Sequence, residues 1–307
     1  MFFRLLAAVA LAAVAGSLSA CGAALASPDD GRVHVAASFY PLQFVVQRIG
    51  GDRVDVTSLT RPGAEPHDLE LTPRDVAGME DADLVVYLRG FQPAVDDAIA
   101  VAGRVTAFDT APAARLDRTL GPVEGGEGQP RETGSPDPHF WLDPTRLSAV
   151  AAAVEQRLER LAPADASGFR ERLATLQRDL ATLDADFRTG LAHCASRDLV
   201  TSHTAFGYLG ERYGLTQLGI TGLSPDAEPG PRQLADVTRF VREHHVRTIY
   251  SETLLSPAVA RTVADETGAA TAVLDPIEGL SARSAGHDYL AVMRADLRTL
   301  RAGQGCS

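Results

Sequence analysis

Residues 137 to 144 read Asp137-Pro138-His139-Phe140-Trp141-Leu142-Asp143-Pro144, a histidine between two prolines. Each proline fixes its own φ angle and restricts the residue before it. Asp143 followed by Pro144 is typical of a helix N-cap and first helical residue, so a helix is expected to begin there. The segment therefore predicts that His139 is held in one direction against a helix end. The alternative is that Phe140 and Trp141 are core residues and His139 is only their hydrogen-bonded neighbour.

The composition is that of a folded globular protein. Of 307 residues, 45% are hydrophobic and 22% are charged, which is enough for a buried core and for two domains. The formal net charge is -11 and all 29 basic residues are arginine. No basic patch for nucleic acid or anionic lipid is evident, so no nucleic-acid partner is expected. A metal cation suits this charge, although ordinary solubility also explains it.

The N-terminus has the pattern of an export signal. Arg4 precedes an apolar run over residues 5–14, and small residues lead to Leu18-Ser19-Ala20-Cys21. This is the cleavage pattern of a bacterial lipoprotein, so residues 1–20 are expected to be removed and Cys21 to carry lipid. Residues 21–32 would then tether an extracytoplasmic protein to the cell membrane. The alternative is an ordinary secretory signal in which Cys21 occurs by coincidence.

The chain has three cysteines, an odd number for an exported protein. If Cys21 is lipidated, Cys194 and Cys306 remain as one pair, which should be oxidised outside the cytoplasm. Such a bond closes a loop on the order of a hundred residues, for which the chain-entropy model gives a stabilisation of up to roughly 4 to 5 kcal/mol.

The region after residue 33 alternates β-rich runs with amphipathic helical stretches, as in a parallel sheet covered on both faces. Expected strands of the first half are 33–38, 54–59, 84–88 and 105–108, with helices at 43–49, 73–79 and 93–101. In the second half we expect strands at 199–202, 216–220, 248–251 and 271–274, with helices at 204–213, 231–243, 257–267 and 288–301. The sequence therefore predicts an α/β protein of two parallel-sheet lobes.

One long helix is expected between the two halves, from about residue 165 to 192. Apolar residues recur there in steps of three and four, at Phe169, Leu173, Leu176, Leu180, Leu183, Phe187 and Leu191. At 1.5 Å per residue this helix spans roughly 40 Å, the width of a domain. We interpret it as a spine (163–193) that joins an N-terminal lobe (33–162) to a C-terminal lobe (194–307). A coiled-coil partner helix is the alternative, but its heptads are few.

Four potential metal ligands are expected at one edge of the two sheets. His67 follows the second strand, His203 follows the first strand of the second half, and Asp275 ends the last strand. Ligands bind at the carboxyl ends of strands in open α/β sheets. Together with His139 these residues form a set of three imidazoles and one carboxylate, which suits a divalent metal and zinc above all. The alternative is solvated loop histidines, which is what we expect of the other five: His34, His193, His244, His245 and His287.

The order of these motifs resembles the substrate-binding lipoproteins of zinc-uptake ABC transporters. The matching segments are Pro66-His67 with Glu70 and Pro73, Asp137 to Pro144, Thr201-Ser202-His203-Thr204-Ala205-Phe206-Gly207-Tyr208, Leu274-Asp275-Pro276, Ser38-Phe39-Tyr40-Pro41 and Glu252-Thr253-Leu254. The resemblance implies two α/β lobes bridged by one rigid helix, with Zn²⁺ buried in the cleft as transported ligand and handed to a membrane permease. The family's ligand positions fall on His67, His139, His203 and Asp275.

Two details refine the resemblance. Many zinc members carry a His-rich loop before the Asp-Pro-His motif, whereas residues 122–135 here contain glutamates and no histidine, so zinc capture by this loop is not expected. Manganese members tend to have a carboxylate at the position of His203, so the histidine favours zinc. A manganese transporter component or an adhesin with the same site remains an alternative.

A zinc hydrolase is the rival from another class, because three protein ligands and a water also build catalytic zinc. Glu65 or Glu252 would then be the base, and either could instead assist coordination. Against a hydrolase, Asp275 would close the site, and neither a His-Glu-x-x-His helix nor a nucleophile elbow is present. We therefore expect a binding protein and not an enzyme, acting as a monomer.

Overall fold

The structure is a computed structural model that describes residues 31–119 and 136–307. Residues Val33–Ser307 form one compact unit, which is described here by itself. The predicted signal peptide, the predicted lipidation site Cys21 and the loop at 122–135 lie outside the described residues. Within the described ranges, no helix combines the length and apolar character that crossing a membrane requires.

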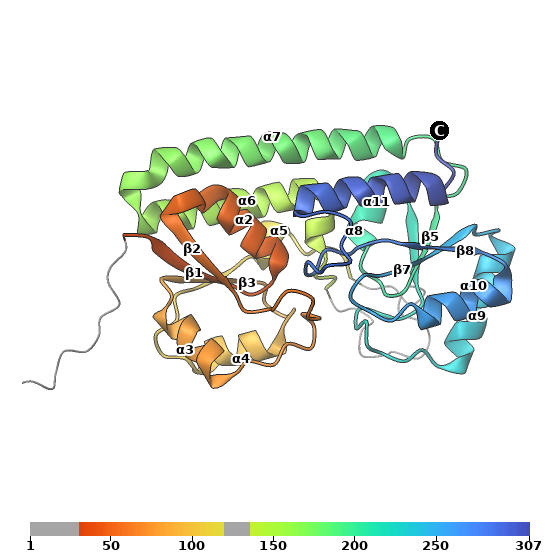
Figure 1. Cartoon of the computed structure of the whole chain (residues 1–307), viewed down its shortest axis with the longest axis horizontal. Helices are drawn as coiled ribbons and strands as arrows, with labels where there is room; N and C mark the ends of the chain where they lie inside the picture. The colour runs from red at the N-terminus through yellow and green to blue at the C-terminus, as the bar shows by residue number, and fades with distance from the viewer. Residues whose placement is uncertain (1–30, 120–135) are drawn as a thin grey trace, which may run out of the picture. The chain divides into compact units, whose positions relative to one another are not determined.

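The first lobe is built on a parallel sheet with strand order β2-β1-β3-β4 (Figure 1). Its strands are β1 (Val33–Ala37), β2 (Val54–Ser58), β3 (Leu84–Tyr87) and β4 (Ala107–Asp109), connected through α2 (Tyr40–Gly50), α3 (Pro73–Asp81) and α4 (Pro93–Val101). All four residues of β3 are buried, as expected for a central strand covered by helices on both faces.

The second lobe repeats this topology with strand order β6-β5-β7-β8. Its strands are β5 (Asp198–Thr201), β6 (Thr216–Gly219), β7 (Thr248–Ser251) and β8 (Ala270–Val273), and its helices are α8 (Gly207–Tyr213), α9 (Pro231–Glu243), α10 (Ala258–Thr267) and α11 (Tyr289–Gly303). The prediction of two parallel-sheet lobes is confirmed. In both sheets the carboxyl ends of the strands point to the same edge, where the loops that carry the site begin.

Helix α8 begins three residues later than the sequence predicted. Thr204 donates its backbone N–H to Gly222 O over 2.9 Å and its hydroxyl to Thr221 O over 3.1 Å. These bonds tie the residues after β5 to the loop after β6, so the helix starts only at Gly207. The short irregular segment that results contains His203.

A long helix connects the lobes as predicted. After α5 (Ala111–Ala114) and α6 (Pro144–Leu161), helix α7 runs from Ala166 to Gly190. Its 25 residues span roughly 37 Å. Figure 1 shows α7 alongside α6 and α11, and it packs against both of them and against α2. One hydrophobic core includes residues of both sheets and of this helix, and each lobe also has a smaller core of its own.

Polar contacts fix α7 to each lobe. On the first lobe, Arg172 Nε donates to Ile49 O over 2.6 Å and Arg48 Nη2 donates to Asp179 Oδ2 over 2.6 Å. On the second lobe, Asp184 accepts from Arg212 Nε over 2.6 Å and from the Tyr213 hydroxyl over 3.0 Å. Bidentate and charge-assisted bonds of this kind restrict rotation as well as separation.

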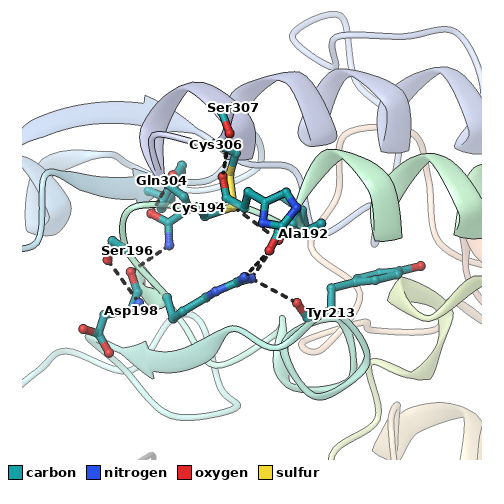
Figure 2. The surroundings of a disulfide bond; sticks show 12 residues. Ala192, Cys194, Ser196, Asp198, Tyr213, Gln304, Cys306 and Ser307 are labelled. Carbon is teal, nitrogen blue, oxygen red and sulfur yellow. Dashed lines mark hydrogen bonds between the residues drawn. A yellow bond between two sulfur atoms is a disulfide. The ribbon is translucent and has the colours of Figure 1, made fainter.

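A disulfide joins Cys194 to Cys306, with 3.8 Å between their Cα atoms, and confirms the predicted pairing. Figure 2 shows it between the end of α7 and the C-terminus of the chain. Gln304 Nε2 donates to Asp198 O over 2.9 Å, and Ser307 N donates to His193 O over 3.0 Å. The disulfide therefore holds the last turn of α11 against the start of β5.

We expect removal of this disulfide to destabilise the protein without disturbing the metal site. The two cysteines are 112 residues apart, for which the chain-entropy model gives up to about 5 kcal/mol. For a domain of this size that corresponds to a fall in melting temperature of up to roughly 10–20 °C. Thermal unfolding of a C194S/C306S variant, beside the oxidised wild type, measures it. Equal melting temperatures, or two thiols that alkylate without reductant, would contradict the prediction.

Candidate metal centre

The segment that presents His139 is fixed by its own backbone and side-chain bonds. Asp143 accepts from Thr145 N over 2.8 Å and caps α6, as the sequence predicted. A single 3-10 turn, η2 (Phe140–Leu142), precedes the cap, and all three of its residues are buried. Asp137 Oδ1 accepts from His139 N over 3.0 Å. His139 is therefore both a neighbour of core aromatics and a side chain with a fixed direction.

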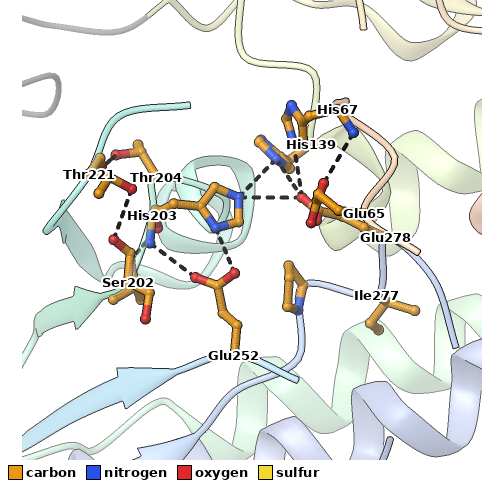
Figure 3. A network of polar contacts seen from close by, with 12 residues as sticks. Glu65, His67, His139, Ser202, His203, Thr204, Thr221, Glu252, Ile277 and Glu278 are labelled. Carbon is orange, nitrogen blue, oxygen red and sulfur yellow. Dashed lines mark hydrogen bonds and ion pairs between the residues drawn. The ribbon is translucent and has the colours of Figure 1, made fainter. Parts of the chain in front are cut away.

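Four donor atoms converge from both lobes. The Nε2 atoms of His67, His139 and His203 lie 3.2, 3.0 and 3.3 Å from one oxygen, Glu278 Oε1. His139 Nε2 and His203 Nε2 are 3.4 Å apart, and all four donors lie within 4.8 Å of one another (Figure 3). A tetrahedron with ligand distances of about 2.0–2.2 Å has edges of about 3.3–3.6 Å, and the four separations given above, 3.0–3.4 Å, lie within a few tenths of an ångström of that range.

Asp275 is not part of this group, and Glu278 supplies the carboxylate instead. The Oδ1 atom of Asp275 accepts from Ile277 N over 2.8 Å, which fixes the turn that follows β8. Glu278 lies three residues further along the same loop. Sequence reasoning missed it because both acids follow the last strand and the nearer one was chosen. The sequence shows this second carboxylate three positions after Asp275, but nothing in it decides between the two acids.

Carboxylates behind two of the imidazoles orient the rings. His139 Nδ1 lies 2.8 Å from Asp137 Oδ1, and His203 Nδ1 lies 2.7 Å from Glu252 Oε2. A carboxylate accepts hydrogen bonds, so Nδ1 carries the proton and Nε2 is directed at the donor group. Asp137 in turn lies 3.3 Å from Arg118 Nε. This is the carboxylate–histidine arrangement that raises the basicity of metal-binding imidazoles.

The same carboxylates decide the protonation of two histidines. Burial alone would lower the pKa of His139, but its bonds to Asp137 and Glu278 outweigh burial and raise that pKa. Burial would likewise lower the pKa of His203, yet the charges of Glu252 and Glu278 raise that pKa well above its ordinary value. Protons therefore compete with a metal ion for both Nε2 atoms near neutral pH.

His67 and Glu278 behave differently. For His67, burial is the largest influence and lowers its pKa despite the charge of Glu278. For Glu278, burial would raise the pKa, but the charges of His67 and His203 together with the hydrogen bonds hold that pKa well below its usual range. The four donors thus contain an ionised carboxylate, as a cation site requires.

Glu65 lies beside the donor group without belonging to it. Its Oε1 accepts from His67 N over 3.1 Å, and Figure 3 shows its carboxyl group next to Glu278. Burial, and then the charge of Glu278, raise the pKa of Glu65 to about 9. A carboxyl group that is neutral at pH 7 does not act as a general base, so Glu65 is not suited to that role. Glu252 is not free for it either, because its two oxygens contact the backbone N–H and the ring Nδ1 of His203.

Two α/β lobes that share a helix and contribute to a buried donor set of this kind define a metal-binding member of the solute-binding proteins. The ZnuA family, "Zinc-uptake complex component A periplasmic", matches residues 35–303, and the chain belongs to this family. The resemblance noted from the motifs is thereby confirmed.

Curated relatives agree with this assignment. The high-affinity zinc uptake system protein ZnuA of Bacillus subtilis (strain 168) is 34% identical over 298 residues, covering 95% of this chain and 93% of the relative. The zinc-binding protein AdcA of Streptococcus pyogenes serotype M6 is 33% identical over 288 residues, which is 89% of this chain. The chain spans only 56% of the length of that relative.

Solved structures share the fold. The laminin binding protein Lmb of Streptococcus agalactiae, described as bifunctional with adhesin and metal transporting activity, superposes with a TM-score of 0.77 at 32% identity, covering 89% of this chain and 99% of that one. The Zn(II)-bound ZnuA-like domain of Streptococcus pneumoniae AdcA gives a TM-score of 0.74 at 31% identity, with the same coverage of 89% and 99%.

We expect metal binding to release protons at neutral pH. His139 and His203 have raised pKa values, so each imidazole is more fully protonated at pH 7 than a free histidine, and a metal ion must displace that proton from Nε2. Zinc binding should therefore release protons, and as pH falls the affinity should begin to drop above the free histidine value of about 6.5. Calorimetric titration in buffers of different ionisation enthalpy measures the release. A value near zero at pH 7 would contradict this account.

Proposed function

We propose that this protein binds Zn²⁺ outside the cytoplasm and delivers it to the membrane permease of an ABC transporter. The observation that carries the proposal is the convergence of three imidazole Nε2 atoms on Glu278 Oε1 at 3.0–3.3 Å. The family assignment and the names of the relatives support the same cargo.

The donor chemistry favours zinc over manganese. Three nitrogen donors and one oxygen suit zinc by ligand type and by the Irving–Williams order, whereas Mn²⁺ favours a larger set of oxygen ligands. Copper also binds imidazole, but Cu(II) prefers a tetragonal arrangement that four tetrahedral donors do not provide. Zinc is therefore the ion that both the ligand types and their geometry select.

The site suits binding better than catalysis. His139 and His203 are fully buried, and Glu278 is 1% exposed. Four protein donors fill a tetrahedral shell, so no position is left for the water that a zinc hydrolase activates. The best-placed candidate base, Glu65, has a pKa of about 9. An adhesin role, named for the S. agalactiae relative, would leave this metal site unchanged.

The division of the four donors between the two lobes supports a route for releasing the ion to the permease. His67 and His139 belong to the first lobe, and His203 and Glu278 belong to the second. Movement of one lobe against the other would therefore separate the donors and release the ion to the permease. We propose that the chain works as a monomer, held at the outer face of the cell membrane by lipid on Cys21.

We expect the purified protein to bind one zinc ion through these four side chains. H139A, H203A and E278A should each weaken zinc binding by more than about 100-fold. Loss of a side chain that only hydrogen-bonds a metal ligand typically costs roughly 10–100-fold. Competition titration against a zinc chelator measures these affinities, and H287A serves as a matched control away from the donor group. Unchanged affinity in the three variants, or a wild-type preference for manganese, would overturn the proposal.

We expect the mature protein to begin at Cys21 and to carry lipid there. Mass spectrometry of protein from a membrane fraction should find acyl groups on an N-terminal cysteine, and C21A should shift the protein to the soluble extracytoplasmic fraction. Reversible attachment through one acyl chain is weak, so the fractions should be compared at equal salt. A C21A variant that stays equally membrane-bound would refute the anchor.

A further inference from the structure

The turn that follows β8 carries Glu278 into the donor group. Residues 275–278 leave the last strand, and Leu274 N still donates to Ser251 O over 2.9 Å, so the sheet ladder ends directly before the turn. Glu278 is 1% exposed and presents a single oxygen to three imidazoles. The position of that oxygen depends on the backbone of the two residues before it.

Ile277 adopts a backbone conformation that isoleucine rarely tolerates. Its φ angle is 57°, in the left-handed region, where a β-branched side chain clashes with its own backbone. Three non-glycine residues in the described ranges have positive φ, and of these Ile277 alone is buried, whereas Arg115 and His245 are exposed. Such a conformation persists only when the surroundings over-determine it, and it is typical of functional sites.

Two contacts within the second lobe hold the turn. Asp275 Oδ1 accepts from Ile277 N over 2.8 Å, and Asp275 N donates to Asp296 Oδ1 of α11 over 3.0 Å. The side chain of Ile277 is fully buried in the main hydrophobic core. The turn is thus fastened at its start and at its strained residue.

The third contact comes from the first lobe. Trp141 Nε1 donates to Pro276 O over 2.7 Å, and the Tyr289 hydroxyl donates to Trp141 O over 2.5 Å. Trp141 is fully buried and belongs to the 3-10 turn that directly follows His139, with 5.2 Å between the two ring centroids. One indole N–H therefore links the segment that carries His139 to the turn that carries Glu278.

We propose that Trp141 and Ile277 are positioning residues that set the metal specificity of the site, an inference that rests on the proposed function. They hold Glu278 so that one carboxylate oxygen completes a four-donor shell. A shell of three nitrogens and one oxygen at tetrahedral spacing matches zinc, whereas Mn²⁺ requires additional oxygens. Releasing the turn frees Glu278 to offer both oxygens or to withdraw and admit water, and both changes favour manganese relative to zinc.

The test is W141F, which keeps an aromatic ring in the core and removes the donor to Pro276 O. Zinc affinity should fall by about 10–100-fold, as for other outer partners of metal ligands. Manganese affinity should fall less or rise, so that the zinc-to-manganese affinity ratio drops by at least about 10-fold. In the Co²⁺-loaded variant the intense visible bands of four-coordinate cobalt should weaken. An unchanged ratio and an unchanged cobalt spectrum would overturn the proposal.

A double-mutant cycle separates positioning from general stability. If Trp141 acts through Glu278, W141F should leave zinc affinity unchanged in an E278A background. An equal loss in both backgrounds would overturn the inference while leaving the proposed function intact. Should E278A itself bind zinc like the wild type, the proposed donor set fails, and the inference fails with it.

Two further variants complete the experiment. I277G tolerates positive φ but removes the side chain that anchors the turn, so it should also lower the zinc-to-manganese affinity ratio. This variant provides the test if W141F does not fold. Y250F is the control. It removes a buried hydrogen-bond donor elsewhere in the second lobe, the Tyr250 hydroxyl that donates to Gln304 Oε1 over 3.3 Å, and it should leave the zinc-to-manganese ratio unchanged. A ratio that falls equally in Y250F would overturn the assignment to this turn.

Discussion

The contact between the Glu278 carboxylate and three imidazoles is the constraint on which the rest of the structure depends. An ionised carboxylate that is 1% exposed is costly unless charges and hydrogen bonds compensate it. Here the compensation comes from His67, His139 and His203, and two of these rings are backed by carboxylates of their own. Each lobe therefore supplies groups that the other lobe needs, and α7 with the shared core keeps the two within reach.

Much of the fold was predictable because the local signals agree with the final packing. Alternating apolar runs predicted the parallel sheets, steps of three and four predicted α7, and Asp143 with Pro144 predicted the start of α6. Strand-end position selected His67 and His203, the segment between two prolines selected His139, and the structure brings all three together. Where the boundaries differ, as at α8, tertiary bonds of Thr204 outweighed helical periodicity.

The fourth donor was not predictable for a physical reason. An isoleucine gives no sign of a left-handed turn, since it is among the residues that avoid positive φ. Only the tertiary contacts of Asp275, of Trp141 and of the buried Ile277 side chain reverse that preference and carry Glu278 inward. Asp275 resembled a ligand because it follows the strand directly, but it is the residue that shapes the turn. Sequence position identified the loop, while the choice between its two carboxylates was made by packing.

A carrier must release its ion as well as bind it, and the protonation of the site bears on both steps. The pKa values of His139 and His203 are raised and that of Glu278 is lowered, because protonated imidazoles and the ionised carboxylate attract one another strongly. A departing ion therefore does not leave four uncompensated polar groups buried, because protons restore the hydrogen bonds. The same competition reduces the net free energy of zinc binding below that of four free donors. Under the proposed function, the outer carboxylates Asp137 and Glu252 thus do two things: they aim the rings at the metal, and they keep its binding reversible.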